Sequence, residues 1–317
     1  MQIPVSSNAQ HTTLTSYIHK DKQSMTITAT QTRFCHQTWQ LDAQIQLVQN
    51  HNEVTYVVTD VTPFHPVSHI WPDHPADKGI LVFNDQQFEL IDCQVGAIEV
   101  ATGELFVGAA IPVKRDTEGW LFVVVHVLAL VDTLSQGTRV TLKVDKEYQQ
   151  ALSRGHSAGH LAYLALNKVL AASYWRKDAD RKDPHGNYDF NSYAQEASFV
   201  TPDKCLDTYR LGKTLRKRGL NSAEMLSDLE KIESQVNAQL KFWLERDAAI
   251  IMDCHGDNLT DSRYWKCDLG EGELAVIPCG GTHAEHLSDF GSIHVKLVEM
   301  DSQTIEMHTD VIACFSN

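Results

Sequence analysis

The sequence predicts an α+β protein with two parts: a small β-barrel-like domain over residues 1–145 and an α+β domain over residues 146–317. The length of 317 residues fits about two domains. Short runs rich in Val, Ile, Phe and Tyr, separated by turn residues, fill the first half. Long stretches with helical periodicity appear only after residue 146, and strand-like runs return after them. The second half therefore indicates helices packed on a sheet.

The first half contains five predicted strands. Before them, residues 1–31 are rich in Thr, Ser, Gln and His with little periodicity, which fits either a flexible arm or an edge strand. The last strand alternates strictly between polar and apolar residues, so we expect one buried face. Several short strands at this spacing are typical of a small barrel or sandwich. The predicted strands are 53–61, 79–83, 88–95, 119–131 and 138–144.

The second half is predicted to be mixed. Residues 159–172 are rich in Leu and Ala and form a predicted helix, whereas 176–193 are polar and indicate a loop or insertion. Residues 221–247 are predicted as one long helix, because apolar residues recur three and four apart and Asn221 is a suitable N-cap. Four predicted strands complete the domain, at 248–252, 273–277, 293–299 and 311–315.

Composition and charge exclude several classes of protein. The longest apolar run, 120–131, is too short to span a bilayer, and the first residues do not resemble a secretory signal. Seven cysteines without a CxxC pair fit a reducing compartment, so we expect a cytoplasmic protein. The net charge of −14 means that a nucleic acid would have to bind a local basic patch.

Two short motifs predict a metal site. His156 and His160 are four residues apart, so on a helix they share one face. Cys279 and His283 belong to a CGGTH segment whose glycines allow a tight loop. Each pair alone is a weak signal in a chain with 16 histidines, and a buried Cys beside an exposed His is the alternative. Together they form a Cys–His₃ set, which suits Zn²⁺.

A proline-rich segment, 65–77, concentrates three histidines and two aspartates. It is either an active-site wall or second metal site, or a polar loop with solvated imidazoles, and composition alone favours the polar loop. Its titratable residues are His65, His69, Asp73, His74 and Asp77.

A basic cluster lies between residues 210 and 218. Cationic side chains can neutralise RNA phosphates, although a run of charges is more often a solvated face. Phosphate-binding glycine loops of the GxxxxGK[ST] and GxGxxG types are absent from the sequence. The cluster consists of Arg210, Lys213, Arg216, Lys217 and Arg218.

Two segments resemble a known family. SRGHSAGHL at 153–161 and CGGTHAEHLSDFGSIHVKLVE at 279–299 resemble the editing domain of alanyl-tRNA synthetases and its freestanding relatives, the AlaX-type alanyl-tRNA editing proteins. The family pattern is HTATHL followed, after a long interval, by CGGTH. The resemblance continues through 60–79 and 137–156 and covers roughly 32–315, with a less familiar middle at 173–210.

The resemblance implies a zinc-dependent deacylase that acts in trans on tRNA for alanine mischarged with serine or glycine. The zinc ligands map to the Cys–His₃ set, and Asp77 takes the place of the aspartate in the family's Gly-rich loop, whose glycines and Gln are replaced here. Ser157 stands at the first Thr of HTATH. We expect Ser157 to select serine through its hydroxyl, unless that hydroxyl only bonds to its own helix. Ser157, Asp77 and His74 are the candidate catalytic residues.

Two alternatives remain open at this point. The chain could be a metal-dependent hydrolase of a small ester or amide without tRNA recognition, which the −14 charge and the altered loop favour. It could also be a non-catalytic, zinc-stabilised RNA-binding module. A closed site with four protein ligands is usually structural, so the water-activating group could be Asp77, His74 or a hydroxyl of the terminal adenosine.

Overall fold

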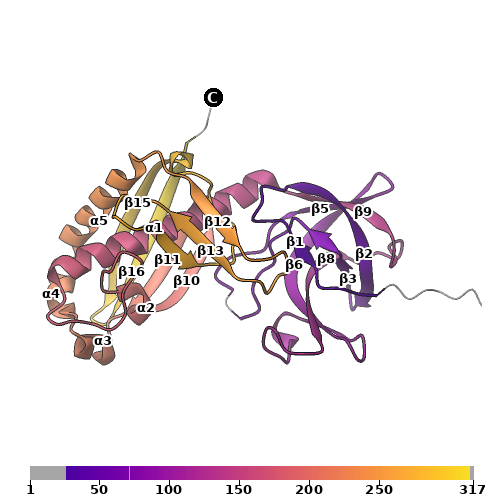
Figure 1. Ribbon diagram of the computed structural model, residues 1–317, viewed down its shortest axis with the longest axis horizontal. Coiled ribbons are helices and arrows are strands. Elements are labelled where there is room, and N and C mark those ends of the chain that lie inside the picture. Colours follow the sequence, from indigo (N-terminus) through magenta and orange to yellow (C-terminus); the bar gives the residue numbers. More distant parts are fainter. Residues whose placement is uncertain (1–25, 71, 315–317) are drawn as a thin grey trace, which may run out of the picture.

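A computed structural model describes residues 26–70 and 72–314 (Figure 1). The predicted arm therefore lies largely outside the described residues. At its end, β1 (Gln31–Thr32) pairs in parallel with β4 (Val61–Thr62). The α+β class is confirmed: a strand-rich half holds residues up to 145, and helices and further sheets follow it.

One seven-stranded sheet dominates the strand-rich half, in the order β5-β9-β2-β3-β8-β6-β7. β5 also pairs with β6, so the strand pairings return to their starting point, and the barrel-like form of this half stays a prediction. All five predicted strands are present, and β2 and β7 were not predicted. The bounds are β2 (Gln40–His51), β3 (Val54–Thr59), β5 (Gly79–Phe83), β6 (Gln86–Glu99), β7 (Leu105–Val107), β8 (Trp120–Ala129) and β9 (Arg139–Val144).

A long helix, α1 (Lys146–Ser173), connects the two halves (Figure 1). Asp145 caps it by accepting a hydrogen bond from the backbone N–H of Tyr148. It begins 13 residues before the predicted start at 159. The sequence misleads here because Gly155 and Gly159 weaken a helical prediction. Both glycines permit close packing: a Cβ on Gly155 would lie 2.6 Å from the carbonyl oxygen of Lys204.

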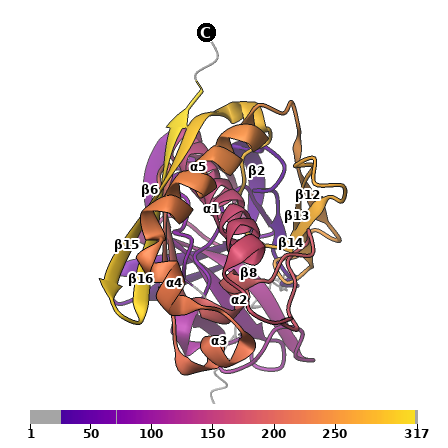
Figure 2. The same cartoon turned by 90° about the vertical axis from the view of Figure 1, so that its left-hand side faces the viewer.

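A four-stranded antiparallel sheet, β10-β11-β16-β15, packs against α1. A separate three-stranded sheet, β12-β13-β14, ends at the residue before Cys279. Figure 2 shows α1 and α5 with β15 and β16 on one side and β12–β14 on the other. β10, β11 and β13 were not predicted. The bounds are β10 (Gln195–Thr201), β11 (Lys204–Arg210), β12 (Ile250–Cys254), β13 (Arg263–Cys267), β14 (Ala275–Pro278), β15 (Phe290–Asp301) and β16 (Thr304–Ala313).

The predicted single helix over 221–247 is wrong in one respect, since it is two helices that meet at Asp228. Asp228 has φ −105° and ψ 15°, and its carboxylate accepts a hydrogen bond from the hydroxyl of Tyr174 at 2.9 Å. Asn221 occupies the predicted N-cap position without a capping side-chain bond. The helices of this region are α2 (Phe190–Ala194), α3 (Lys213–Arg218), α4 (Ser222–Ser227) and α5 (Leu229–Leu244).

The buried apolar residues form separate clusters in the two halves. The largest packs α1 and α5 against the sheets, around Leu166, Trp243 and Val295. A second lies inside the strand-rich half, around Ile45 and Leu142. No helix in the described part of the chain is long and apolar enough to cross a membrane. The division at 145/146 stays a prediction.

Candidate metal centre

The four predicted ligands lie together. His156 and His160 are one turn apart on α1, and Cys279 and His283 lie in the loop after β14. One ligand atom from each residue falls within 4.8 Å of all the others. The sulfur of Cys279 is 3.3 Å from Nε2 of both His156 and His283. The donor set therefore fits a tetrahedral ion such as Zn²⁺.

The buried Nε2 of His160 has no hydrogen-bond partner among the described residues. An unsatisfied buried nitrogen is costly unless it binds something, so this atom supports the fit of a metal. Burial also lowers the pKa of His160 to about 4, which keeps its imidazole neutral. Burial raises the pKa of the Cys279 thiol to about 12 in the absence of a cation. A bound cation favours the thiolate form.

Two ligand imidazoles are oriented through their second nitrogen. Nδ1 of His156 donates to the carbonyl oxygen of Thr282 at 3.2 Å. Nδ1 of His283 lies 3.0 Å from the hydroxyl of Ser157, which also accepts from the backbone N–H of Ala284. Partners of this kind fix the ring orientation and leave Nε2 for the metal.

Ser157 is fully buried and lines none of the pockets that reach the ligand residues. The structure thus puts its hydroxyl against His283 and does not show a bond to its own helix. Its predicted role in choosing the amino acid stays a prediction.

The second glycine of CGGTH, Gly281, is required by close packing. A Cβ on Gly281 would lie 2.6 Å from Cε1 of His156, closer than a side chain tolerates. Only glycine lets this loop come so near the helix that carries two of the ligands.

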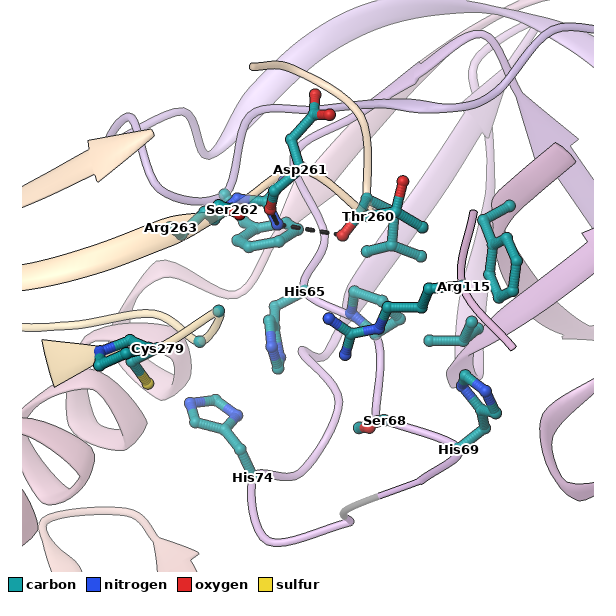
Figure 3. A pocket seen from close by; sticks show the side chains of 18 of the residues that line it. His65, Ser68, His69, His74, Arg115, Thr260, Asp261, Ser262, Arg263 and Cys279 are labelled. Atoms are coloured by element: carbon teal, nitrogen blue, oxygen red, sulfur yellow. Dashed lines mark hydrogen bonds between the residues drawn. The ribbon is translucent and has the colours of Figure 1, made fainter. Parts of the chain in front are cut away.

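A pocket of about 430 Å³ lies beside His156 and Cys279. Residues from the 65–77 segment form one wall, and residues 259–264 form another (Figure 3). His65 and His74 point into this space, and Arg263 lies across from them (Figure 3).

His74 has defined hydrogen-bond roles. Its Nδ1 donates to the carbonyl of Pro75 at 2.8 Å, so its Nε2 is an acceptor, 3.3 Å from the hydroxyl of Thr282. Burial lowers the pKa of His74 to about 4. The imidazole is therefore neutral at pH 7, which suits it to accept a hydrogen bond in the pocket.

Asp77 lies behind the pocket wall, outside its lining. Its Oδ2 accepts from the backbone N–H of His65 at 2.7 Å and from the side-chain amide of Gln149 at 2.6 Å. Burial raises the pKa of Asp77 to about 7. Through these two hydrogen bonds, Asp77 at the end of the 65–77 segment connects its first residue, His65, with Gln149 on α1.

The sequence interpretation missed Arg263. This buried side chain lines the pocket, and its guanidinium donates to the hydroxyl of Thr32 at 2.8 Å and to the carbonyl of Asn258 at 2.7 Å. It makes no ion pair with a carboxylate among the described residues. Its position two residues before Trp265 and four before Cys267 could have indicated it, because alternate residues of a strand share one face and these three are buried together in β13.

A second, smaller pocket of about 170 Å³ lies against the ligands between α1 and the strands β10 and β11. The residues from those strands were also missed, because no strand is predicted for 195–210. Its lining includes His156, His160, Asp73, Ser198, Cys205 and Asp207.

The predicted basic cluster is exposed on β11 and α3, away from the linings of both pockets. Arg210 pairs with Glu196 at 3.4 Å, and Arg218 pairs with Asp180. A second group of cations adjoins it, since the guanidinium groups of Arg181 and Arg218 lie 5.0 Å and 5.7 Å from the ring of Tyr193. Folding thus joins two basic segments that are separate in the sequence.

Comparisons with known proteins point to one group of enzymes. The chain is 26% identical to an alanine–tRNA ligase of Caldivirga maquilingensis over 78% of its length and 22% of the ligase. The corresponding enzyme of Saccharophagus degradans is 26% identical over 75% of the chain and 22% of the ligase. That of Methylacidiphilum infernorum is 24% identical over 87% of the chain and 24% of the ligase.

The chain thus spans about a quarter of the length of the curated relatives it matches. No family model matches it. The similarities support a relation to the alanine–tRNA ligases.

Proposed function

We propose that this protein is a zinc-dependent hydrolase of the AlaX type that deacylates mischarged aminoacyl-tRNA, namely seryl- or glycyl-tRNA for alanine, in trans. The observation that carries the proposal is the His156, His160, Cys279 and His283 group beside a pocket, in a chain related to alanine–tRNA ligases. An aminoacyl ester is already activated, so a positioned water molecule and local positive charge are sufficient chemistry.

The four ligands would hold the zinc ion, which when bound supplies positive charge to polarise the ester carbonyl or a water molecule. His74 is the group best suited to orient the attacking water, because its Nε2 is unprotonated and lies at the pocket wall. The water would take the place of the Thr282 hydroxyl, 3.3 Å away, as the donor to this nitrogen. With a pKa of about 4, His74 would hold the water by a hydrogen bond and remain a weak base. Asp77 would act indirectly, by fixing the segment that carries His74.

The larger pocket suits the 3′-terminal nucleotide of the tRNA. Its volume of about 430 Å³ lies in the usual range for small-ligand sites. Its lining includes two cations, Arg115 and Arg263, that could contact a phosphate, together with two aspartates, Asp73 and Asp261. The remaining RNA would contact the basic surface of α3.

A metal-dependent hydrolase of a small ester or amide is the second candidate. The net charge of −14 and the altered loop at 69–74 favour it, because both weaken the case for RNA recognition. The third candidate, a non-catalytic zinc-stabilised RNA-binding module, requires bound zinc without ester turnover.

The test is incubation of zinc-loaded protein with tRNA charged with serine, glycine or alanine, followed by measurement of free amino acid. We expect faster release of serine and glycine than of alanine, and about one zinc per chain by elemental analysis. Cys279→Ala should lower both metal content and turnover. Release from small esters but not from tRNA would favour the second candidate, and zinc binding with no turnover would favour the third.

A further inference from the structure

The smaller pocket meets the larger one at the metal centre. Both are lined by His156 and Asp73, so a ligand could extend from one into the other past the metal ligands. His160, with its unpartnered Nε2, faces only the smaller pocket. A volume of about 170 Å³ admits a small amino acid and excludes a large one.

The pocket is acidic. Asp73 and Asp207 are part of its lining, and the lining contains no Lys or Arg. Asp207 is only 3% exposed and has no ion-pair partner in the described part of the chain. A buried carboxylate without a cation is costly unless a ligand supplies the positive charge.

Asp207 is held in position by neutral groups. Its Oδ1 accepts from the side-chain amide of Gln195 at 2.8 Å, and its Oδ2 lies 3.6 Å from the sulfur of Cys205. The sulfur is also 3.7 Å from the hydroxyl of Ser198. A carboxylate has about four acceptor positions, so further N–H donors can be accommodated.

The shape of the pocket is particular to this chain. In HSAGH, Gly159 stands where the HTATH pattern has its second Thr. A Cβ on Gly159 would lie 2.8 Å from the sulfur of Cys205, so the thiol occupies the space that a larger residue on α1 would need. The inner wall is thus built by β11, the strand that also carries Asp207.

We propose that this pocket holds the amino-acid part of the ester and that Asp207 receives its α-ammonium group. This inference rests on the proposed function. The proposal makes Asp207 of β11 the residue that selects esters with a free amino group. Asp207 lies within residues 173–210, where the resemblance to the family is weakest.

The test compares two esters on the same tRNA: the seryl ester and its neutral counterpart, the 2,3-dihydroxypropanoyl ester, in which a hydroxyl replaces the ammonium group. The ammonium group itself activates the ester, so each kcat/KM is divided by the uncatalysed hydrolysis rate of the same ester. On that scale we expect wild-type protein to favour the seryl ester by about tenfold or more, the usual effect of a hydrogen bond to a charged group. Asp207→Asn should reduce that preference to within about threefold, with zinc content unchanged. Asp310→Asn is the control and should keep the preference, since Asp310 is a half-exposed aspartate on the neighbouring strand β16 whose carboxylate pairs with Lys204.

The possible failures are distinguishable. Absence of release from every charged tRNA by wild-type protein overturns the proposed function itself. Equal rates on the two esters with wild-type protein, or an undiminished preference in Asp207→Asn, overturn only the assignment of this pocket. The wild-type comparison does not depend on how well the variant folds.

Discussion

Ser157 contacts neither pocket, yet it takes part in two hydrogen bonds at the metal centre. One connects it to Nδ1 of His283 and the other to the backbone of Ala284. Its position between the two helical ligands is what suggested a role in choosing the substrate. The geometry suits a residue that orients a metal ligand, and its role in choosing the substrate stays a prediction.

We therefore expect Ser157→Ala to weaken metal binding by about 10–100-fold, the usual cost of removing a partner behind a ligand. Competition with a zinc chelator measures this directly. Ser153→Ala is a matched control, because Ser153 is a buried serine one turn earlier whose hydroxyl donates only to the carbonyl of Gln149. Equal chelator competition by wild type and Ser157→Ala would contradict this role for the hydroxyl.

At the scale of the structural elements, the conformation of the 65–77 segment is held by one buried carboxyl group, that of Asp77. Asp77 joins it to α1 through His65 and Gln149. Burial raises the pKa of Asp77 from 3.8 to about 7, so between about pH 4 and pH 7 the folded protein binds more protons at this site than the unfolded chain. Its contribution to stability therefore declines as the pH rises through that range.

Asp77→Asn should remove this pH dependence, since one amide oxygen can accept both hydrogen bonds without a buried charge. We expect a higher free energy of unfolding at pH 8, by roughly 2–4 kcal/mol, and little change at pH 4. Urea titrations at the two pH values measure it, with Asp85→Asn in an exposed turn as the control. Because Asp77 lies outside the pocket lining, deacylation should persist. Its complete loss in a well-folded variant would instead make Asp77 the base.

At the scale of the whole molecule, this acidic protein carries a basic area on and beside α3. Lys213, Arg216 and Lys217 on α3 are exposed and make no ion pair among residues 26–70 and 72–314. Arg218 and Arg181 lie beside them around Tyr193. Cations interleaved with an aromatic ring are typical of RNA-binding surfaces.

The double variant Arg216→Gln/Lys217→Gln should weaken tRNA binding and flatten its salt dependence, by about 0.7–0.9 in logarithmic slope for each phosphate that the protein no longer neutralises. Binding titrations across a range of salt concentrations test this. Arg139→Gln/Lys241→Gln removes the same charge from exposed positions on β9 and α5 and should leave the slope unchanged. If the two double variants behave alike, the RNA binds elsewhere.

The metal centre and the α+β class could both be predicted from the amino-acid sequence. Cys279 and His283 are four residues apart, as are His156 and His160. A single loop or a single helical turn is therefore enough to bring the two ligands of each pair together. Likewise β9 follows from strictly alternating polar and apolar residues, which reflect the period of a strand, and β5 follows from a short apolar run bounded by turn residues.

The environment of that centre depends on contacts between distant segments and became visible only in the folded protein. Gly155 and Gly159 lie within α1 because β11 and the turn before it pack closely against them, and these segments are about 45 residues apart in the chain. Asp228 interrupts a periodic helix because it binds Tyr174. Asp207 and Arg263 line pockets only because folding brings distant segments of the chain next to them. The periodicity of the sequence around each residue does not indicate which distant segments these are.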